Sequence, residues 1–397
     1  MRKKILKYGM VFVICLIMSL FACNVSAEET VDEADLLIEE QMKTSEMQKI
    51  TEQFENYADN SSSKLMEDYD PEKIIADAAK GSLKMDMPGF LKKILMYLFD
   101  EIFLNINIMI KLVVLVILCA ILKNLQTSFL SENVGEMAFY ACYIVIISIL
   151  IVSFNSAMQL GREIIDNIVG FMHATIPVLI ALMVSGGNIA SGGIFEPVMI
   201  AVVEISGTIM KNVFMPLVFF SMILSVIGNI SEKIQVTRLI SFLKQINGWG
   251  LGLILTIFVG IVSLQGSLGA LVDGVTSKTA KFAITAAIPV AGKYLADASE
   301  TVIACTLLIR NAAGVAAMIG VILMCMAPLM KMFALLLVYK LTCIIIEPIS
   351  EKRITGCMNE LSNSLTHLLG ISASVMFMFL ITITAIIGAS NISAMIR

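Results

Sequence analysis

Charged side chains are scarce in this sequence. Only 15% of the 397 residues are Asp, Glu, Lys or Arg, against about 25% in ordinary soluble domains. Hydrophobic residues make up 58% of the chain, and the mean hydropathy is +0.88. A soluble domain of this size cannot bury so much apolar surface, but a lipid bilayer can accommodate it. The composition excludes a soluble enzyme and a disordered regulator, and it predicts a polytopic membrane protein.

Metal-ligating and redox motifs are also missing. The chain has two histidines, His173 and His367, and its eight cysteines form no C-x-x-C pair. Residues 28–102 contain no cysteine, so they have no disulfide framework. We therefore predict no metal site and no cofactor, and we expect the cysteines in apolar runs to be small core residues.

Nucleotide-binding and hydrolase motifs are absent from the whole sequence. Gly292-Lys293 resembles the end of a phosphate-binding loop, but residue 287 is Ala and residue 294 is Tyr. The first glycine and the magnesium-binding hydroxyl of that motif are therefore missing. We predict that the protein is not an enzyme and has no catalytic residue. Any energy coupling would come from a separate ATPase or an ion gradient.

The N-terminus has the layout of a secretory leader. Four basic residues within the first seven positions precede an apolar run from Met10 to Ala22, and Val25-Ser26-Ala27 supplies a small-residue cleavage site. This predicts a signal peptide over residues 1–27. An uncleaved anchor helix and a lipoprotein signal ending before Cys23 are the alternatives. All three export the residues that follow.

Residues 28–102 form a separate acidic segment. They hold 19 acidic and 8 basic side chains, which argues against binding nucleic acid. Asp70-Pro71 is typical of a helix start, with an N-cap followed by proline, and the helix should end near Lys80, before Gly81. We predict an exported helical segment that packs on a partner or on the membrane domain. A solvated acidic spacer is the alternative.

Residues 103–397 contain apolar runs long enough to cross about 30 Å of hydrocarbon. They predict an all-α transmembrane bundle of about eight spans, because some of the nine runs are marginal in length. Counting Lys and Arg in the connections of that arrangement gives no bias between the two sides. The nine runs are 103–122, 137–158, 168–184, 194–210, 213–230, 249–268, 301–325, 329–346 and 369–387.

Ionisable residues inside these runs are the candidate functional residues, because a charge at bilayer depth costs a few kcal/mol. They would either form structural ion pairs or line a polar path through the bundle. The candidates are Lys111, His173, Glu196, Glu204, Arg310 and Glu347.

A glycine-rich link joins the third and fourth runs. Residues 185–193 are small and uncharged, and they include Gly186, Gly187, Gly192 and Gly193. Such a link is either a flexible turn or a re-entrant, gate-like loop, since irregular backbone at membrane depth needs protein or water around it.

Several longer motifs resemble those of a known family. They are Glu196-Pro-Val-Met, Glu204-Ile-Ser-Gly207, Asp273-Gly-Val-Thr-Ser-Lys-Thr-Ala-Lys-Phe282, Ile288-Pro-Val-Ala-Gly-Lys-Tyr294 and Leu307-Leu-Ile-Arg-Asn-Ala-Ala-Gly314. Together with the leader, the acidic segment and the chain length, they resemble stage III sporulation protein AE of endospore-forming Firmicutes.

The resemblance implies a multi-pass protein of the mother-cell membrane around the forespore, with residues 28–102 outside the cytoplasm. It implies membership of a secretion-like transenvelope complex that maintains the forespore and permits late forespore gene expression. The implied partners are membrane and ring proteins from the same operon and a cytoplasmic secretion-type ATPase; a homo-oligomer is left open. The family motifs carry no known chemistry, so no catalytic residue follows from them.

Two hypotheses of function lead from the sequence, and two others rank behind them. A permease-like subunit would form a membrane path, and a non-conducting platform would position the other components. A general small-molecule permease is a third reading, and an integral membrane enzyme is a fourth.

Overall fold

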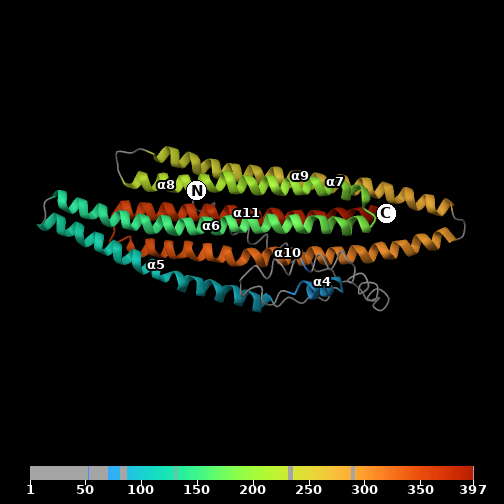
Figure 1. Cartoon of the computed structure of the whole chain (residues 1–397), viewed down its shortest axis with the longest axis horizontal. Coiled ribbons are helices and arrows are strands. Elements are labelled where there is room, and N and C mark those ends of the chain that lie inside the picture. Colours follow the sequence, from blue (N-terminus) through green and yellow to red (C-terminus); the bar gives the residue numbers. More distant parts are fainter. Residues whose placement is uncertain are drawn as a thin grey trace.

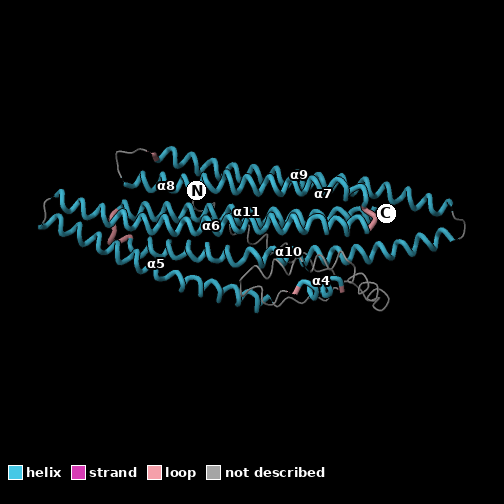
Figure 2. Tube along the Cα trace, viewed as in Figure 1, coloured by secondary structure: helices cyan, strands magenta, loops and turns pink. Residues whose placement is uncertain are grey.

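Every regular element in the described part of the chain is helical. The computed structural model describes residue 52 and residues 70–80, 87–129, 132–230, 236–287 and 291–396. None of these residues forms a strand, which confirms the all-α prediction (Figure 2). The leader and the first part of the acidic segment, including residues 1–51, lie outside the described residues.

The described elements are long helices joined by short connections (Figure 1). They are α4 (Pro71–Ala79), α5 (Met87–Phe129), α6 (Glu132–Ser185), α7 (Ile189–Ile209), the π-helical turn η1 (Met210–Phe214), α8 (Met215–Ile230), α9 (Thr237–Ala287), α10 (Ala291–Ile346) and α11 (Lys352–Ile396).

Successive long helices run in opposite directions along one axis (Figure 1). The helix made of α7, η1 and α8 counts as one of them, because η1 continues both neighbours without a break. The ends of α5, α8 and α10 lie together at one end of the bundle, and the ends of α6, α9 and α11 lie toward the other.

The described residues contain six helices that are long and apolar enough to cross a membrane, where the sequence predicted about eight spans. Three pairs of apolar runs lie on continuous helices. α6 continues through the polar residues near Arg162, η1 joins α7 to α8, and α10 continues through Pro328. Short polar breaks do not end a helix when its backbone hydrogen bonds can continue past them.

These six apolar segments are 30 to 46 residues long. At 1.5 Å per residue they measure about 45 to 69 Å, which exceeds the hydrocarbon thickness of about 30 Å. The helices therefore extend beyond the apolar layer of a bilayer on at least one side.

The start of α4 has the local structure that the sequence predicted. Asp70 is the N-cap, with its Oδ1 accepting a hydrogen bond from the backbone N of Lys73 at 3.2 Å, and Pro71 is the first helical residue. The helix ends at Ala79, as expected from the glycine at 81. α4 packs against α10, and Ile75 is fully buried. By contrast, α5 runs without a break through residues 102 and 103, between the predicted acidic segment and the predicted membrane domain.

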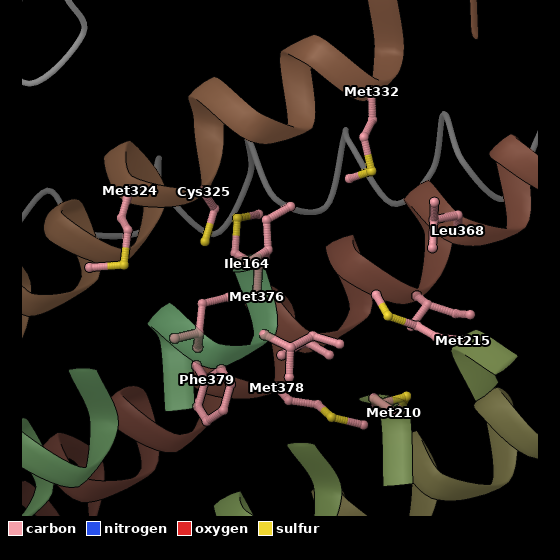
Figure 3. Packing of buried hydrophobic residues seen from close by; sticks show 14 of the residues in the cluster. Ile164, Met210, Met215, Met324, Cys325, Met332, Leu368, Met376, Met378 and Phe379 are labelled. Atoms are coloured by element: carbon pink, nitrogen blue, oxygen red, sulfur yellow. The ribbon is translucent and has the colours of Figure 1, made fainter. Parts of the chain in front are cut away.

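Sulfur-containing and aromatic side chains fill the space between the long helices. Figure 3 shows Met210, Met215 and Met378 close together, with Ile164 and Phe379 from neighbouring helices. Five of the six described cysteines are buried, and all six are free thiols, as expected for small core residues. Flexible methionine side chains fit irregular gaps between helices.

Two glycines bring α6 and α7 into close contact. A Cβ at Gly207 would lie 2.5 Å from Val169 Cγ2, and one at Gly192 would clash with Val184 Cγ2. Small residues at such positions let two helix backbones approach, which is how membrane helices gain packing energy.

Candidate functional site

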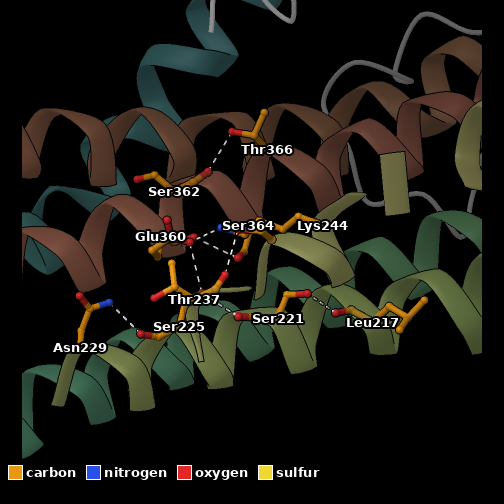
Figure 4. Close-up of polar contacts among 11 residues, drawn as sticks. Leu217, Ser221, Ser225, Asn229, Thr237, Lys244, Glu360, Ser362, Ser364 and Thr366 are labelled. Carbon is orange, nitrogen blue, oxygen red and sulfur yellow. Dashed lines mark hydrogen bonds and ion pairs between the residues drawn. The ribbon is translucent and has the colours of Figure 1, made fainter. Parts of the chain in front are cut away.

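A polar cluster lies between α8, α9 and α11, inside the otherwise apolar bundle (Figure 4). Its centre is an ion pair between Lys244 of α9 and Glu360 of α11. Ser225 of α8 donates its hydroxyl toward Glu360 Oε2 at 3.2 Å. The side chains of Lys244 and Glu360 are 20% and 32% exposed, so this pair is shielded from the surroundings more than the other ion pairs of the long helices described below.

The polar residues that α8 contributes to the cluster are brought together by their spacing in the sequence. Ser221, Ser225 and Asn229 recur every four residues and so share one face of the helix. Ser221 and Ser225 donate to backbone carbonyl oxygens one turn earlier, and Asn229 Nδ2 donates to the Ser225 carbonyl at 2.7 Å. These bonds satisfy polar groups within the helix, and the single hydroxyl proton of Ser225 is shared between the Ser221 carbonyl at 2.8 Å and Glu360 Oε2 at 3.2 Å.

On α11, a glycine precedes Glu360 by one helical turn. Gly356 lies one turn before Glu360, and a Cβ there would be 2.7 Å from Asn229 Oδ1. The glycine therefore lets α8 and α11 approach closely beside the ion pair. His367 follows two turns after Glu360 on the same helix.

One buried amide stands beside the cluster on α9. Asn247 lies three residues after Lys244, so the two share a face of the helix, and it is only 4% exposed. Its Oδ1 has no hydrogen-bond partner among the described residues. A buried carbonyl oxygen of this kind can accept a hydrogen bond from water or from a polar solute.

The cluster lies about two turns inside one end of the helices. Lys244 is seven residues from the start of α9, and Glu360 is eight residues from the start of α11. At 1.5 Å per residue, both are about 10 to 12 Å from that end of the bundle. A carboxylate shared by an ammonium and a hydroxyl, with an imidazole nearby, can exchange protons and can bind a small polar or charged group.

Two further ion pairs join α6 to the helix that follows it. His173 Nε2 and Glu204 Oε2 are 2.7 Å apart, which brings together two of the candidates from the sequence. Lys211 of η1 binds both carboxylate oxygens of Asp166, at 2.6 and 2.7 Å. All four side chains are more than a third exposed, so these pairs lie on the outside of the bundle.

Arg310 is the most deeply placed candidate. It is 1% exposed, and its Nη2 donates to the backbone carbonyl of Ile387 at 3.0 Å. A guanidinium that reaches a carbonyl on the neighbouring helix ties α10 to α11. Gly314, one turn later on α10, faces the side chain of the same Ile387.

The other candidate residues lie apart from the cluster. Lys111 is exposed on α5, Glu196 is half-buried on α7, and Glu347 is exposed in the turn after α10. The described residues contain no group of three or more His, Cys, Asp or Glu side chains arranged to hold a metal.

The glycine-rich link is a tight turn followed by the first turn of α7. Asn188 N donates to the Met183 carbonyl at 3.2 Å, Gly187 N donates to the Val184 carbonyl at 2.9 Å, and Gly187 has φ 85°. This is the Schellman arrangement, which ends a helix with a glycine in the left-handed region. Gly192 and Gly193 belong to α7, where Gly192 is packed against α6 and Gly193 faces open space.

None of the residues of the central cluster was among the candidates predicted from the sequence. Lys244 lay before the apolar run 249–268, and Glu360 lay before the apolar run 369–387. The Ser221, Ser225 and Asn229 repeat inside an apolar run was the available signal, since polar residues on one face of a membrane helix indicate a polar neighbour.

The comparisons agree with the family motifs. A sequence model of the family described as Stage III sporulation protein AE matches residues 69–390. The chain belongs to this family. A relative named Stage III sporulation protein AE, from Bacillus subtilis (strain 168), is 35% identical over 335 residues, which cover 82% of this chain and 83% of the relative.

Membership confirms the resemblance that the motifs indicated. The stage III sporulation protein AE family is a family of sporulation membrane proteins and is not a known enzyme family. No solved structure matches the chain. The comparisons therefore establish the family, and the geometry comes from the structure described above.

Proposed function

We propose that this protein is a permease-like membrane subunit of a transenvelope complex between the mother cell and the forespore. The complex would maintain the forespore and permit late forespore gene expression. Family membership supports the sporulation role, and the six long apolar helices support insertion in a membrane. The observation that carries the permease-like role is the Lys244–Glu360 cluster inside the bundle.

A conducting role needs polar groups that a solute or proton can reach within the apolar layer. Lys244 and Glu360 supply opposite charges, and the buried Asn247 oxygen supplies an acceptor. Ionisable residues within membrane helices are usually placed where ions, protons or substrates pass, because they are otherwise costly. The chain has no nucleotide-binding motif, so we assign energy input to a separate cytoplasmic ATPase of the complex.

The proposed orientation rests on the leader, and two short turns support it. If residues 28–86 are exported, the start of α5 and the α6–α7 turn face the same extracytoplasmic side, because α5 and α6 run in opposite directions along the bundle (Figure 1). No Lys or Arg occurs in residues 163–210, which contain that turn, and Lys340, Lys352 and Arg353 flank the α10–α11 turn at the other end, although Lys278, Lys281 and Lys293 flank the α9–α10 connection. Basic residues favour the cytoplasmic side.

The test is a gene deletion followed by complementation in the sporulating host. We expect engulfed forespores of the deletion strain to shrink and to fail to switch on a late forespore reporter. The wild-type gene should restore both, and a Glu360→Gln gene should not, at equal protein abundance. Normal reporter activity in the deletion strain would remove the sporulation role. Full complementation by Glu360→Gln would remove the role of the cluster.

An assembly platform is the second candidate, and the packing of α4 favours it. Ile75 is fully buried although it belongs to the acidic segment, so this segment is attached to the bundle and can present its charged face to other proteins. Under this alternative, deletion of residues 30–80 reduces recovery of the partner ring proteins. Under the permease-like role, Glu360→Gln abolishes the reporter while the partners are still recovered.

A further inference from the structure

The outer face of α6 is polar over a long distance. Between residues 148 and 173, every exposed side chain of this helix is polar or charged except Val152. The exposed polar residues are Ser148, Asn155, Ser156, Gln159, Arg162, Glu163, Asp166, Asn167 and His173. We call this set the α6 stripe. It covers 25 residue steps, or about 38 Å along the helix axis.

The opposite face of α6 is apolar and buried. Leu150, Phe154, Ile165 and Phe171 are at most 1% exposed and pack in the core. α6 contacts α5, α7, α10 and α11 on its other sides. The helix is therefore amphipathic, with its polar face directed away from the bundle.

Other outer faces of the bundle are suited to lipid. On α5, Leu104 and Ile121 are 71% and 51% exposed, and on α9, Trp249 and Leu264 are 75% and 67% exposed. These large apolar side chains can contact hydrocarbon directly. The α6 stripe is polar, unlike the outer faces of α5 and α9, although α6 is also one of the six long apolar helices.

Lipid cannot cover the α6 stripe. The two serines are satisfied within the helix, since Ser148 and Ser156 donate to the carbonyls of Ile144 and Val152. The amides of Asn155 and Gln159 and the charges of Arg162 and Glu163 project outward from the same face. A charged residue facing hydrocarbon costs roughly 2.5 to 3.5 kcal/mol on insertion scales, so this face requires protein or water.

We propose that the α6 stripe is the contact surface for a second copy of this chain. The inference rests on the proposed function, because it requires the long helices to span a membrane. Two copies in one membrane share the same direction, so a two-fold axis along the membrane normal places each stripe against the other in parallel. Arg162 of one copy then lies level with Glu163 of its partner, and the contact repeats on the other side of the axis.

Charge pattern favours this occupant over an unrelated protein. Arg162 and Glu163 are neighbours in sequence and both are exposed, so the stripe is self-complementary in a parallel pair. The surrounding amides can hydrogen-bond to each other or to water held between the copies.

Cysteine cross-linking in membranes tests the contact. Asn155→Cys and Gln159→Cys place a thiol on the stripe, and Leu264→Cys places one on the apolar outer face of α9 as the matched control. A disulfide needs Cα atoms within about 7 Å. Under mild oxidation we expect the two stripe variants to give a disulfide-linked dimer at least fivefold above the wild-type chain. The control should stay at the wild-type level.

Three results would overturn the proposal. The first is a lack of dimer from both stripe variants, and the second is an equal dimer yield from Leu264→Cys. The third is a cross-link to a protein of another mass. None depends on the sporulation reporter, so a failed dimer and a failed function are distinguished.

A charge exchange between copies gives an independent readout. In one copy, Arg162→Glu makes both positions 162 and 163 acidic. In the other copy, Glu163→Arg makes both positions basic. With differently tagged copies, we expect the mixed pair to be recovered together at least threefold better than either variant with itself. Equal recovery of all pairs would contradict the Arg162–Glu163 contact.

Discussion

Lys211 binds both carboxylate oxygens of Asp166, at 2.6 and 2.7 Å, across the antiparallel contact between α6 and the π-helical turn η1. His173 lies seven residues after Asp166, and Glu204 lies seven residues before Lys211, and these two are also paired. The two ion pairs are therefore separated by two turns on α6 and by two turns on the helix that follows it. Both pairs fit the same alignment of the two helices. The π-helical turn carries the lysine, and such turns frequently occur at functional positions.

Reversing one charge of the Asp166–Lys211 pair should weaken the α6–η1 contact. Asp166→Lys opposes two ammonium groups, and we expect it to lower the free energy of unfolding by about 1 kcal/mol, since exposed pairs contribute little each. Asp166→Lys with Lys211→Asp should restore the wild-type value. Thermal unfolding in detergent measures both, and an unrestored double variant would show that the pair does not act as a unit.

Neutralising one partner of the Lys244–Glu360 pair should lower the free energy of unfolding more than reversing a charge of the Asp166–Lys211 pair. The pair is largely shielded, and removing one partner of a buried pair costs up to about 3 to 5 kcal/mol because the other charge is left uncompensated. Lys244→Met should therefore reduce the melting temperature and abolish the late forespore reporter. Arg238→Met, an exposed arginine two turns earlier on the same helix, is the matched control and should leave both unchanged. Equal effects from the two variants would argue against a special role for the pair.

Adding a side chain at Gly207 should separate α6 from α7. Its Cβ would meet Val169 Cγ2 at 2.5 Å, and overpacking of this kind costs about 1 to 3 kcal/mol. Gly207→Ala is therefore expected to lower the melting temperature. Gly193→Ala on the same helix has no atom within 4 Å of the new Cβ and should not destabilise the protein. A stable Gly207→Ala variant would mean that the helices can move apart without loss.

The cap of α4 should depend on pH through Asp70. A hydrogen bond from the Lys73 side chain is the main cause that lowers the pKa of this carboxyl below 3.8. Because the pKa is lower in the folded state, the stabilisation is present above pH 3.8 and is lost as the pH falls through the folded-state pKa. We expect the backbone amide of Lys73 to exchange faster with deuterium at pH 3 than at pH 5, after correction for intrinsic exchange rates.

Asp70→Asn is the control for that experiment. Asparagine also caps helices but does not titrate, so protection of the Lys73 amide should then be independent of pH. A protection that falls with pH in both proteins would assign the change to another group.

The sequence determined the helical class, the membrane character and the family. Long apolar runs leave the backbone of a membrane segment only its own helix for hydrogen bonding, and Asp70-Pro71 is enough to start α4 because its signals are local. Charges such as Glu204 could also be selected from the sequence, since a charge within an apolar run is visible there.

Tertiary structure decided which of these residues meet. Whether Arg162 or Pro328 ends a helix depends on the packing of its neighbours, so nine apolar runs gave six long helices. Lys244 and Glu360 are 116 residues apart, and no local pattern relates them. The polar face of α6 is recognisable only when its other sides are seen packed against four helices, because exposure is a property of the assembled bundle and not of the chain.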